Sequence, residues 1–196
     1  MDVLECLKTN LEASIRAKHE LLKDSACLSL FGKAVEVVVS RYRIGGRIYI
    51  AGNGGSAADA QHLAAEFVSK LARVRDPLPA EALTVDSSII TAIGNDFGFD
   101  MIFSRQIAGK ATERDVFLGI TTSGQSPNIL KALEQCRVMG IPSIIFSGRD
   151  GGTAKAMADC CVVAPGRTTS TIQELHICLA HTLCECVEYA VFGSES

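Results

Sequence analysis

The stretch Arg47-Ile-Tyr-Ile-Ala51, followed by Gly52-Asn-Gly-Gly55, decides how this chain is expected to fold. The apolar run predicts a short buried strand, bounded by Gly45-Gly46 before it and by the glycine loop after it. A helix is expected from about Ser56 to Lys70. A strand that passes through a glycine loop into a helix is the start of a βαβ unit.

The same alternation recurs along the chain. Two helices are expected before the first strand, one from the apolar spacing of Leu4, Leu7, Leu11, Ile15 and Leu22 and one over residues 28–39. Further strands are expected at 81–85, 116–120, 141–146 and 160–164, and further helices at 88–93, 127–139 and 171–191. Ser126 is the expected N-cap of the helix that begins at Pro127. The pattern predicts an α/β fold, a three-layer αβα sandwich around a doubly wound parallel sheet of about five strands.

Size and composition limit the classes of protein to consider. A chain of 196 residues with 47% hydrophobic and 21% charged residues predicts one compact domain, with N-terminal helices over 1–44 and an α/β core over 45–196. The net charge of -3 and the dispersed basic residues argue against a nucleic-acid partner. The N-terminus resembles neither a signal peptide nor a membrane span, so a cytoplasmic protein is expected.

Eight cysteines raise the question of disulfides or a metal site. Their spacing contains no C-x-x-C pair, and most lie in apolar runs, where a thiol acts as a small hydrophobic group. They are expected to be reduced and structural: Cys6, Cys27, Cys136, Cys160, Cys161, Cys178, Cys184 and Cys186.

The first and last helices carry more apolar residues than one small sheet can cover. We therefore expect these helices to pack between subunits of an oligomer as well.

Two loops are placed for ligand binding, because ligands of open parallel sheets bind beyond the carboxyl ends of the strands. Gly52-Asn-Gly-Gly-Ser56 exposes backbone N–H groups at the start of a helix, which suits an anion. Thr121-Thr-Ser-Gly-Gln-Ser126 offers four hydroxyls and a second helix start. Together they predict a cradle for phosphate and hydroxyl groups, although a plain tight turn also explains the first loop. Neither loop matches a nucleotide-binding fingerprint.

Four side chains on two helices are candidates for chemistry. His62 and Glu66 are four residues apart and share a helix face, as metal ligands, as a base with its partner, or as a solvated pair. Gln173 follows Ser170 by three residues, so a capping box also explains it. His181 has apolar neighbours and is also explained as a core histidine. Eight residues of helix separate Gln173 from His181 by roughly 12 Å, so either a central ligand is reached from both or subunits share the site.

Several motifs, in order, resemble one known family, the phosphoheptose isomerases, also called sedoheptulose 7-phosphate isomerases. They are Ala51-Gly-Asn-Gly-Gly-Ser-Ala-Ala-Asp-Ala-Gln-His62, Ala64-Ala-Glu-Phe67, Thr91-Ala-Ile-Gly-Asn-Asp96, Phe103-Ser-Arg-Gln106, Thr122-Ser-Gly-Gln-Ser-Pro-Asn128, Gly148-Arg-Asp-Gly-Gly152 and Ile172-Gln-Glu-Leu-His176. The resemblance runs from about residue 40 to 190.

This resemblance implies a sugar-isomerase (SIS) domain, a homotetramer, one zinc ion per subunit, and conversion of sedoheptulose 7-phosphate to D-glycero-D-manno-heptose 7-phosphate. The reaction begins heptose biosynthesis for bacterial surface glycans such as lipopolysaccharide. Carried over by position, the metal ligands are His62, Glu66, Gln173 and His181, and the catalytic acid/base pair is Glu66 and His181. The implied substrate contacts are Asn53, Gly54, Gly55, Glu66, Asn95, Asp96, Thr121, Thr122, Ser123, Ser126 and Gln173.

The chain departs from the family pattern at Lys70, where an arginine is common, and at Ser170-Thr171, where a pair such as Asp-Arg is common. Lysine lacks the bidentate contact that arginine makes with phosphate. Three alternatives remain compatible with this resemblance: an SIS scaffold for a replication initiator, a sugar-phosphate-sensing regulator, and an isomerase of another phosphosugar. The presence of Glu66 and His181 argues against the scaffold, and the lack of a helix-turn-helix segment argues against the regulator.

Overall fold

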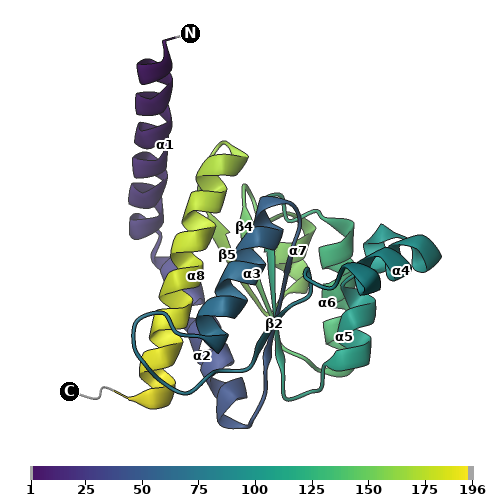
Figure 1. Cartoon of the computed structure of the whole chain (residues 1–196). Helices are drawn as coiled ribbons and strands as arrows, with labels where there is room; N and C mark the ends of the chain where they lie inside the picture. Colours follow the sequence, from purple (N-terminus) through teal and green to yellow (C-terminus); the bar gives the residue numbers. More distant parts are fainter. Residues whose placement is uncertain (1, 194–196) are drawn as a thin grey trace.

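The computed structural model describes residues 2–193. Helices and strands alternate after two N-terminal helices, and Figure 1 shows their arrangement. In chain order the elements are α1 (Val3–Lys23), α2 (Ser25–Arg43), β1 (Ile48–Gly52), α3 (Gly55–Val68), β2 (Ala80–Ala82), α4 (Ser87–Phe97), the 3-10 helix η1 (Phe99–Met101), α5 (Ser104–Lys110), β3 (Val116–Thr121), α6 (Pro127–Met139), β4 (Ser143–Gly148), α7 (Gly152–Met157), β5 (Cys160–Ala164) and α8 (Thr169–Phe192).

The five strands form one parallel sheet in the order β2-β1-β3-β4-β5. The chain therefore winds outward in both directions from β1 and β3, which confirms the predicted doubly wound sheet. Ile48 of β1 pairs with Val116 of β3, so the loops that follow these two strands leave the sheet side by side. This is the point at which ligands bind in doubly wound sheets.

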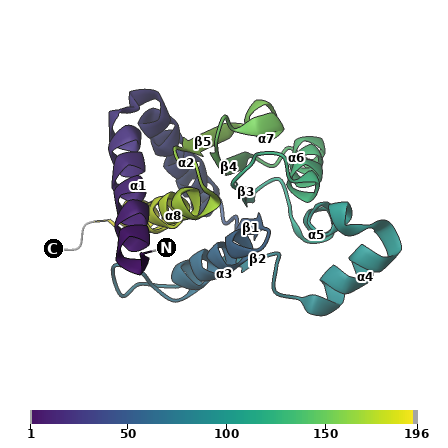
Figure 2. The same ribbon diagram turned by 90° about the horizontal axis from the view of Figure 1, so that it is seen from above.

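Each face of the sheet is covered by its own layer of helices, as Figure 2 shows. On one face α2, α3 and α8, with a small contribution from α1, form an apolar cluster that includes Val38, Leu63 and Leu183. On the other face α5, α6 and α7 form a second cluster that includes Ile107 and Ile129. The predicted three-layer αβα arrangement is confirmed.

Several predicted boundaries differ from the structure. The strand expected from residue 141 begins at Ser143, because Pro142 has no N–H to donate to the sheet and contributes its carbonyl to Phe117 instead. The strand expected over 81–85 is the edge strand β2, only three residues long. The helix η1 and the helix α5 were not predicted.

Helix α8 is long and apolar enough to cross a membrane by length and composition alone. It is instead a core helix, because Leu175, Leu179 and Leu183 pack in the apolar cluster beneath the sheet. It also carries the fully buried Glu188, paired with Arg75. The helix belongs to the interior of the globular fold.

All eight cysteines fall within the described residues and are free thiols, as predicted. Five of them are buried, whereas Cys6 and Cys178 are exposed and Cys186 is half-buried. Burial raises the pKa of Cys136 and of Cys184 to about 12. These buried thiols behave as small apolar groups and are not reactive nucleophiles.

Candidate active site

The loop after β1 turns tightly into α3. Gly54 has a φ of 56°, a conformation that suits glycine, and α3 begins at Gly55. The amide side chain of Asn53 exchanges two hydrogen bonds with that of the buried Asn128 at the start of α6, each 2.9 Å long. This pair ties the first ligand loop to the second.

The loop after β3 holds its hydroxyls close together. Thr121 Oγ1 lies 3.1 Å from Ser126 Oγ, and Ser123 Oγ accepts a hydrogen bond from the backbone N–H of Gln125. Ser126 occupies the predicted N-cap position of α6, but its side chain makes no capping hydrogen bond because the hydroxyl faces Thr121. The N-terminus of α6 therefore lies beside a cluster of hydroxyls.

The loop between β4 and α7, which contains Gly151, packs against the loop that follows β3. The backbone N–H of Ala154 donates to the carbonyl of Gly124 at 3.0 Å, and Thr153 Oγ1 donates to Gln125 Oε1 at 2.8 Å. A side chain at Gly124 would collide with the backbone of Gly151 and Gly152. Gly124 and Gly152 are thus required by direct backbone contact.

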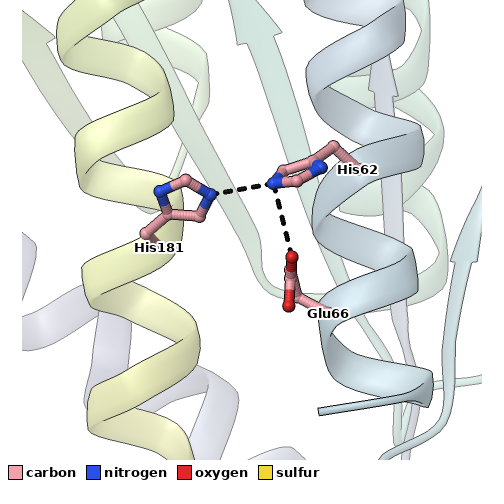
Figure 3. Close-up of side chains that lie close together, drawn as sticks. All are labelled: His62, Glu66 and His181. Carbon is pink, nitrogen blue, oxygen red and sulfur yellow. Dashed lines mark hydrogen bonds and ion pairs between the residues drawn. The ribbon is translucent and has the colours of Figure 1, made fainter. Parts of the chain in front are cut away.

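Three of the predicted side chains meet between α3 and α8, as Figure 3 shows. His62 Nε2 lies 2.8 Å from His181 Nε2 and 3.4 Å from Glu66 Oε1. The two imidazole rings meet edge to face, and their centroids are 5.1 Å apart. His62 is exposed, and Glu66 and His181 are half-buried, so the cluster is accessible to solvent. His181 is therefore paired with His62 and is not an isolated core histidine.

The donor atoms of this cluster match those that zinc prefers. One atom from each of His62, Glu66 and His181 lies within 4.8 Å of the other two. Two imidazole nitrogens and one carboxylate oxygen form a ligand set found in catalytic zinc sites, which leave one position open. Because the two Nε2 atoms face each other, at most one of them carries a proton, and the other offers a lone pair. The residues present fit a zinc ion.

Gln173 lies on α8, nearer to the N-terminus of the helix than His181. The N-cap of α8 is Thr168, whose side chain accepts a hydrogen bond from Thr171, so a capping box at Ser170 is the wrong explanation for Gln173. The amide of Gln173 instead contacts Gly55, where an added Cβ would collide with it. Because it precedes His181 by eight residues, Gln173 lies roughly 12 Å along the helix from the cluster.

Asn95 and Asp96 lie on α4, which carries no buried residue and extends away from the sheet (Figure 2). Asn95 Nδ2 donates to Asp96 Oδ1 at 2.8 Å. Asp96 lines a cavity of about 300 Å³ between α4 and α5. A separate cavity of about 150 Å³, lined in part by Asn53 and Gly54, adjoins the first loop. A single chain thus does not bring these two residues into the cavity at Asn53.

Two residues near the site were not predicted to have a role. Asn128 lies at the start of a helix that follows a hydroxyl-rich loop, and this position is the sequence signal for a role in the site. Asp59, one turn before His62, has a half-buried carboxyl whose pKa is raised by burial, with His62 acting in the opposite direction.

Known proteins resemble this chain along nearly its whole length. Residues 7–148 match the family model described as the SIS domain. The chain is 45% identical over 189 residues to the phosphoheptose isomerase of Aneurinibacillus thermoaerophilus, covering 96% of each. It is 46% identical over 187 residues to phosphoheptose isomerase 2 of Campylobacter jejuni, covering 95% of this chain and 93% of that one.

A solved structure extends the similarity to three dimensions. The phosphoheptose isomerase from Neisseria gonorrhoeae superposes with a TM-score of 0.89 at 40% identity, covering 95% of this chain and 98% of that chain. The similarity takes in both ligand loops and the helices α3 and α8, which carry the clustered side chains. The chain therefore belongs to the SIS domain family, and within it to the phosphoheptose isomerases.

Proposed function

We propose that this protein is an aldose-ketose isomerase that converts sedoheptulose 7-phosphate to D-glycero-D-manno-heptose 7-phosphate, at the start of activated-heptose synthesis in the cytoplasm. The observation that carries the proposal is the meeting of Glu66, His62 and His181, which come from two helices far apart in the chain. The names of the relatives of this chain support the same activity.

The two loops at the centre of the sheet bind the sugar phosphate in this proposal. Thr121, Thr122, Ser123 and Ser126 supply hydroxyls at the N-terminus of α6, whose partial positive charge favours an anion. Gly54 and Gly55 leave the backbone of the first loop accessible, and Asn53 is held toward the second loop by Asn128. Gln173, placed against Gly55, contacts the sugar at the start of α3.

Glu66 and His181 carry the proton transfers. The Glu66 carboxylate removes the proton from one of the carbons C1 and C2 of the sugar and returns it to the other, through an enediol. His181 moves a proton between the two oxygens on these carbons, so the reaction is balanced without any added oxidant or reductant. Because a carboxylate has two oxygens, one is free to face the substrate while the other faces His62.

His62, Glu66 and His181 hold a zinc ion in this proposal, with Gln173 as a further ligand by resemblance alone. Zinc, when bound, would polarise the carbonyl of the sugar as a Lewis acid. Because Gln173 and His181 are roughly 12 Å apart along α8, either a ligand between them is reached from both or more than one subunit contributes to the site. A homotetramer is implied by the resemblance alone, and in this proposal the exposed α4, which carries Asn95 and Asp96, contacts another subunit.

One assay tests the activity and the metal together. The purified protein is given sedoheptulose 7-phosphate, with and without a chelator, and NMR follows the anomeric signal of the aldose. We expect aldose to form, its formation to stop after chelation, and added Zn²⁺ to restore it. No aldose from the metal-loaded protein would contradict the proposed activity.

Two variants test the roles of the side chains. Glu66→Gln and His181→Ala are each expected to lower kcat by about 10²- to 10⁴-fold, the usual contribution of a general acid or base. Glu134→Gln, which changes an exposed carboxyl on α6, serves as the control and should keep wild-type kcat. Near-normal turnover by Glu66→Gln would remove the carboxylate from the mechanism.

A further inference from the structure

An ion pair buried between the segment after α3 and helix α8 takes no part in the chemistry proposed above. The side chains of Arg75 and Glu188 are 2% and 0% exposed, and Arg75 Nη2 lies 2.8 Å from Glu188 Oε1. Arg75 Nε donates to the same oxygen at 2.9 Å. Burying two charges removes them from water, and apolar side chains of similar size often serve stability as well or better. Stability alone is therefore a poor explanation of this pair.

Arg75 fixes the end of α3. Its Nη2 donates to the carbonyl of Glu66 at 2.9 Å, and its Nη1 donates to the carbonyl of Phe67 at 2.7 Å and to that of Ser69 at 3.3 Å. The last carbonyls of a helix have no partner within the helix, so the guanidinium supplies one. One of these carbonyls belongs to Glu66 itself, whose side chain lies in the cluster.

Glu188 fixes the same segment to α8. Its Oε1 and Oε2 accept hydrogen bonds from the backbone N–H groups of Leu71 and Ala72, each at 3.0 Å. Glu188 follows His181 by seven residues, which is about two turns of helix, so both side chains project from one face of α8. The pair thus connects the backbone at Glu66 to the helix face that carries His181.

Apolar contacts bring α3 and α8 together, and the ion pair adds directional contacts between them. Phe67 and Leu183 belong to the same apolar cluster. The hydrophobic effect has no preferred direction. A planar guanidinium with several fixed N–H donors, by contrast, determines both distance and direction.

We propose that Arg75 and Glu188 are positioning residues that set the location of Glu66 relative to His181 for the isomerase reaction. The inference rests on the function proposed above, in which these two side chains transfer the protons. A displacement of about 1 Å in a reacting group costs about 100-fold in rate, so a rigid connection at this place has a direct effect on turnover.

The test compares variants that differ in charge, in stability and in location. Glu188→Gln keeps an acceptor for only one of the N–H groups of Leu71 and Ala72 and removes the ion pair, and Arg75→Lys keeps the charge but loses the planar donors. The double variant Arg75→Met/Glu188→Gln removes both charges and is expected to be more stable than Glu188→Gln, in which the charge of Arg75 stays buried without its partner. Leu133→Ala, in the apolar cluster on the opposite face of the sheet, serves as the matched destabilised control.

We expect Glu188→Gln and Arg75→Lys to lower kcat by about 10- to 100-fold, with KM changed by less than about threefold. Leu133→Ala should lower the melting temperature by a similar amount and keep kcat. The double variant should have a higher melting temperature than Glu188→Gln without regaining kcat. If kcat of Glu188→Gln equals that of Leu133→Ala, or returns in the double variant, the pair is merely structural and the proposal is overturned.

A second readout needs no turnover. Co²⁺ added to the metal-free protein reports its coordination by visible absorption, and the two single variants should bind Co²⁺ about tenfold more weakly than Leu133→Ala, since ligand geometry sets metal affinity. If the wild type binds Co²⁺ but isomerises no sugar, the proposed function fails. The Co²⁺ affinities of the variants then alone test whether Arg75 and Glu188 position the cluster. Equal Co²⁺ affinity in Glu188→Gln and Leu133→Ala then overturns the inference, and a wild type with neither property overturns both proposals.

Discussion

His176 is buried on α8 with one ring nitrogen bonded and one not. Nε2 lies 2.9 Å from the carbonyl oxygen of Ser147, so Nε2 carries the proton and donates it. Nδ1 is buried and has no hydrogen-bond partner among the described residues. Burial lowers the pKa of His176 to about 4, against the opposing effect of the Ser147 carbonyl. The folded protein therefore keeps this imidazole neutral where the unfolded chain protonates it.

The stability of the protein should fall in mild acid because of this residue. Between pH 6.5 and about 4 the unfolded chain binds a proton at His176 that the folded chain does not, so stability is complete above pH 6.5 and decreases below it. The full loss, reached below about pH 4, is about 3 kcal/mol, and about 2 kcal/mol of it falls between pH 7.5 and pH 5. Urea unfolding at pH 7.5 and pH 5 measures this part.

The variant His176→Gln should show a smaller loss between these two pH values than the wild type. His19→Gln, at an exposed position on α1, should leave the loss unchanged. Equal pH dependence in the wild type and in His176→Gln would contradict the assignment.

The helices α3 and α8 lie side by side, with Gly55 against Gln173 at one end and His62 against His181 further along. Gly55→Ala places a methyl group against the amide of Gln173, which is the movable end of a flexible side chain. The fold should therefore survive, and the melting temperature should stay equal or rise, because alanine favours helix over glycine. Turnover, measured as kcat/KM, should fall by roughly tenfold as Gln173 is displaced.

Gly32→Ala on α2 is the matched control, because an added Cβ there meets nothing within 4 Å. It should raise the melting temperature slightly and leave kcat/KM unchanged. If both variants kept wild-type activity, the contact between Gly55 and Gln173 would have no functional role.

The sequence predicts the helix over 127–139 and the strand over 160–164 with the bounds that the structure has, because Pro127 and a continuous apolar run mark them clearly. The segment 99–110 was missed, since its apolar residues suit a strand as well as a short helix and only tertiary packing decides. Gln173 illustrates a further limit: a local rule, the capping box, explained a residue whose actual contact, Gly55, is more than a hundred residues away.

The site was predictable only in part, because some of its contacts also join residues that are far apart in the chain. Spacing alone placed His62 and Glu66 on one helix face, and the loops after two strands at one edge of the sheet. The approach of His181 to His62 depends on how two distant helices pack, which no local pattern contains. The resemblance to a family named these residues together; their roles stay a prediction.

At the scale of the whole molecule, α1 extends beyond the rest of the fold (Figure 1). Its apolar side chains Leu4, Leu7, Leu11 and Ile15 are all more than half exposed. A contiguous apolar surface of this kind is typical of a protein interface. The predicted oligomer would bury it.

Leu7→Glu/Leu11→Glu should therefore reduce the oligomer to smaller species, because two charges would have to enter an apolar interface. Light scattering after gel filtration gives the mass. Val138→Glu, at a position 80% exposed on α6, is the control and should leave the mass unchanged. A wild-type mass of one chain, or an unchanged mass in the double variant, would rule out α1 as the interface.

The backbone contact of Gly124 with Gly151 and Gly152 has a consequence for engineering a new sugar preference. A grafted Thr121–Ser126 segment that lacks glycine at position 124 would collide with the resident Gly151–Gly152 backbone. The transplantable unit is both segments together, and a design library should vary them as a single cassette.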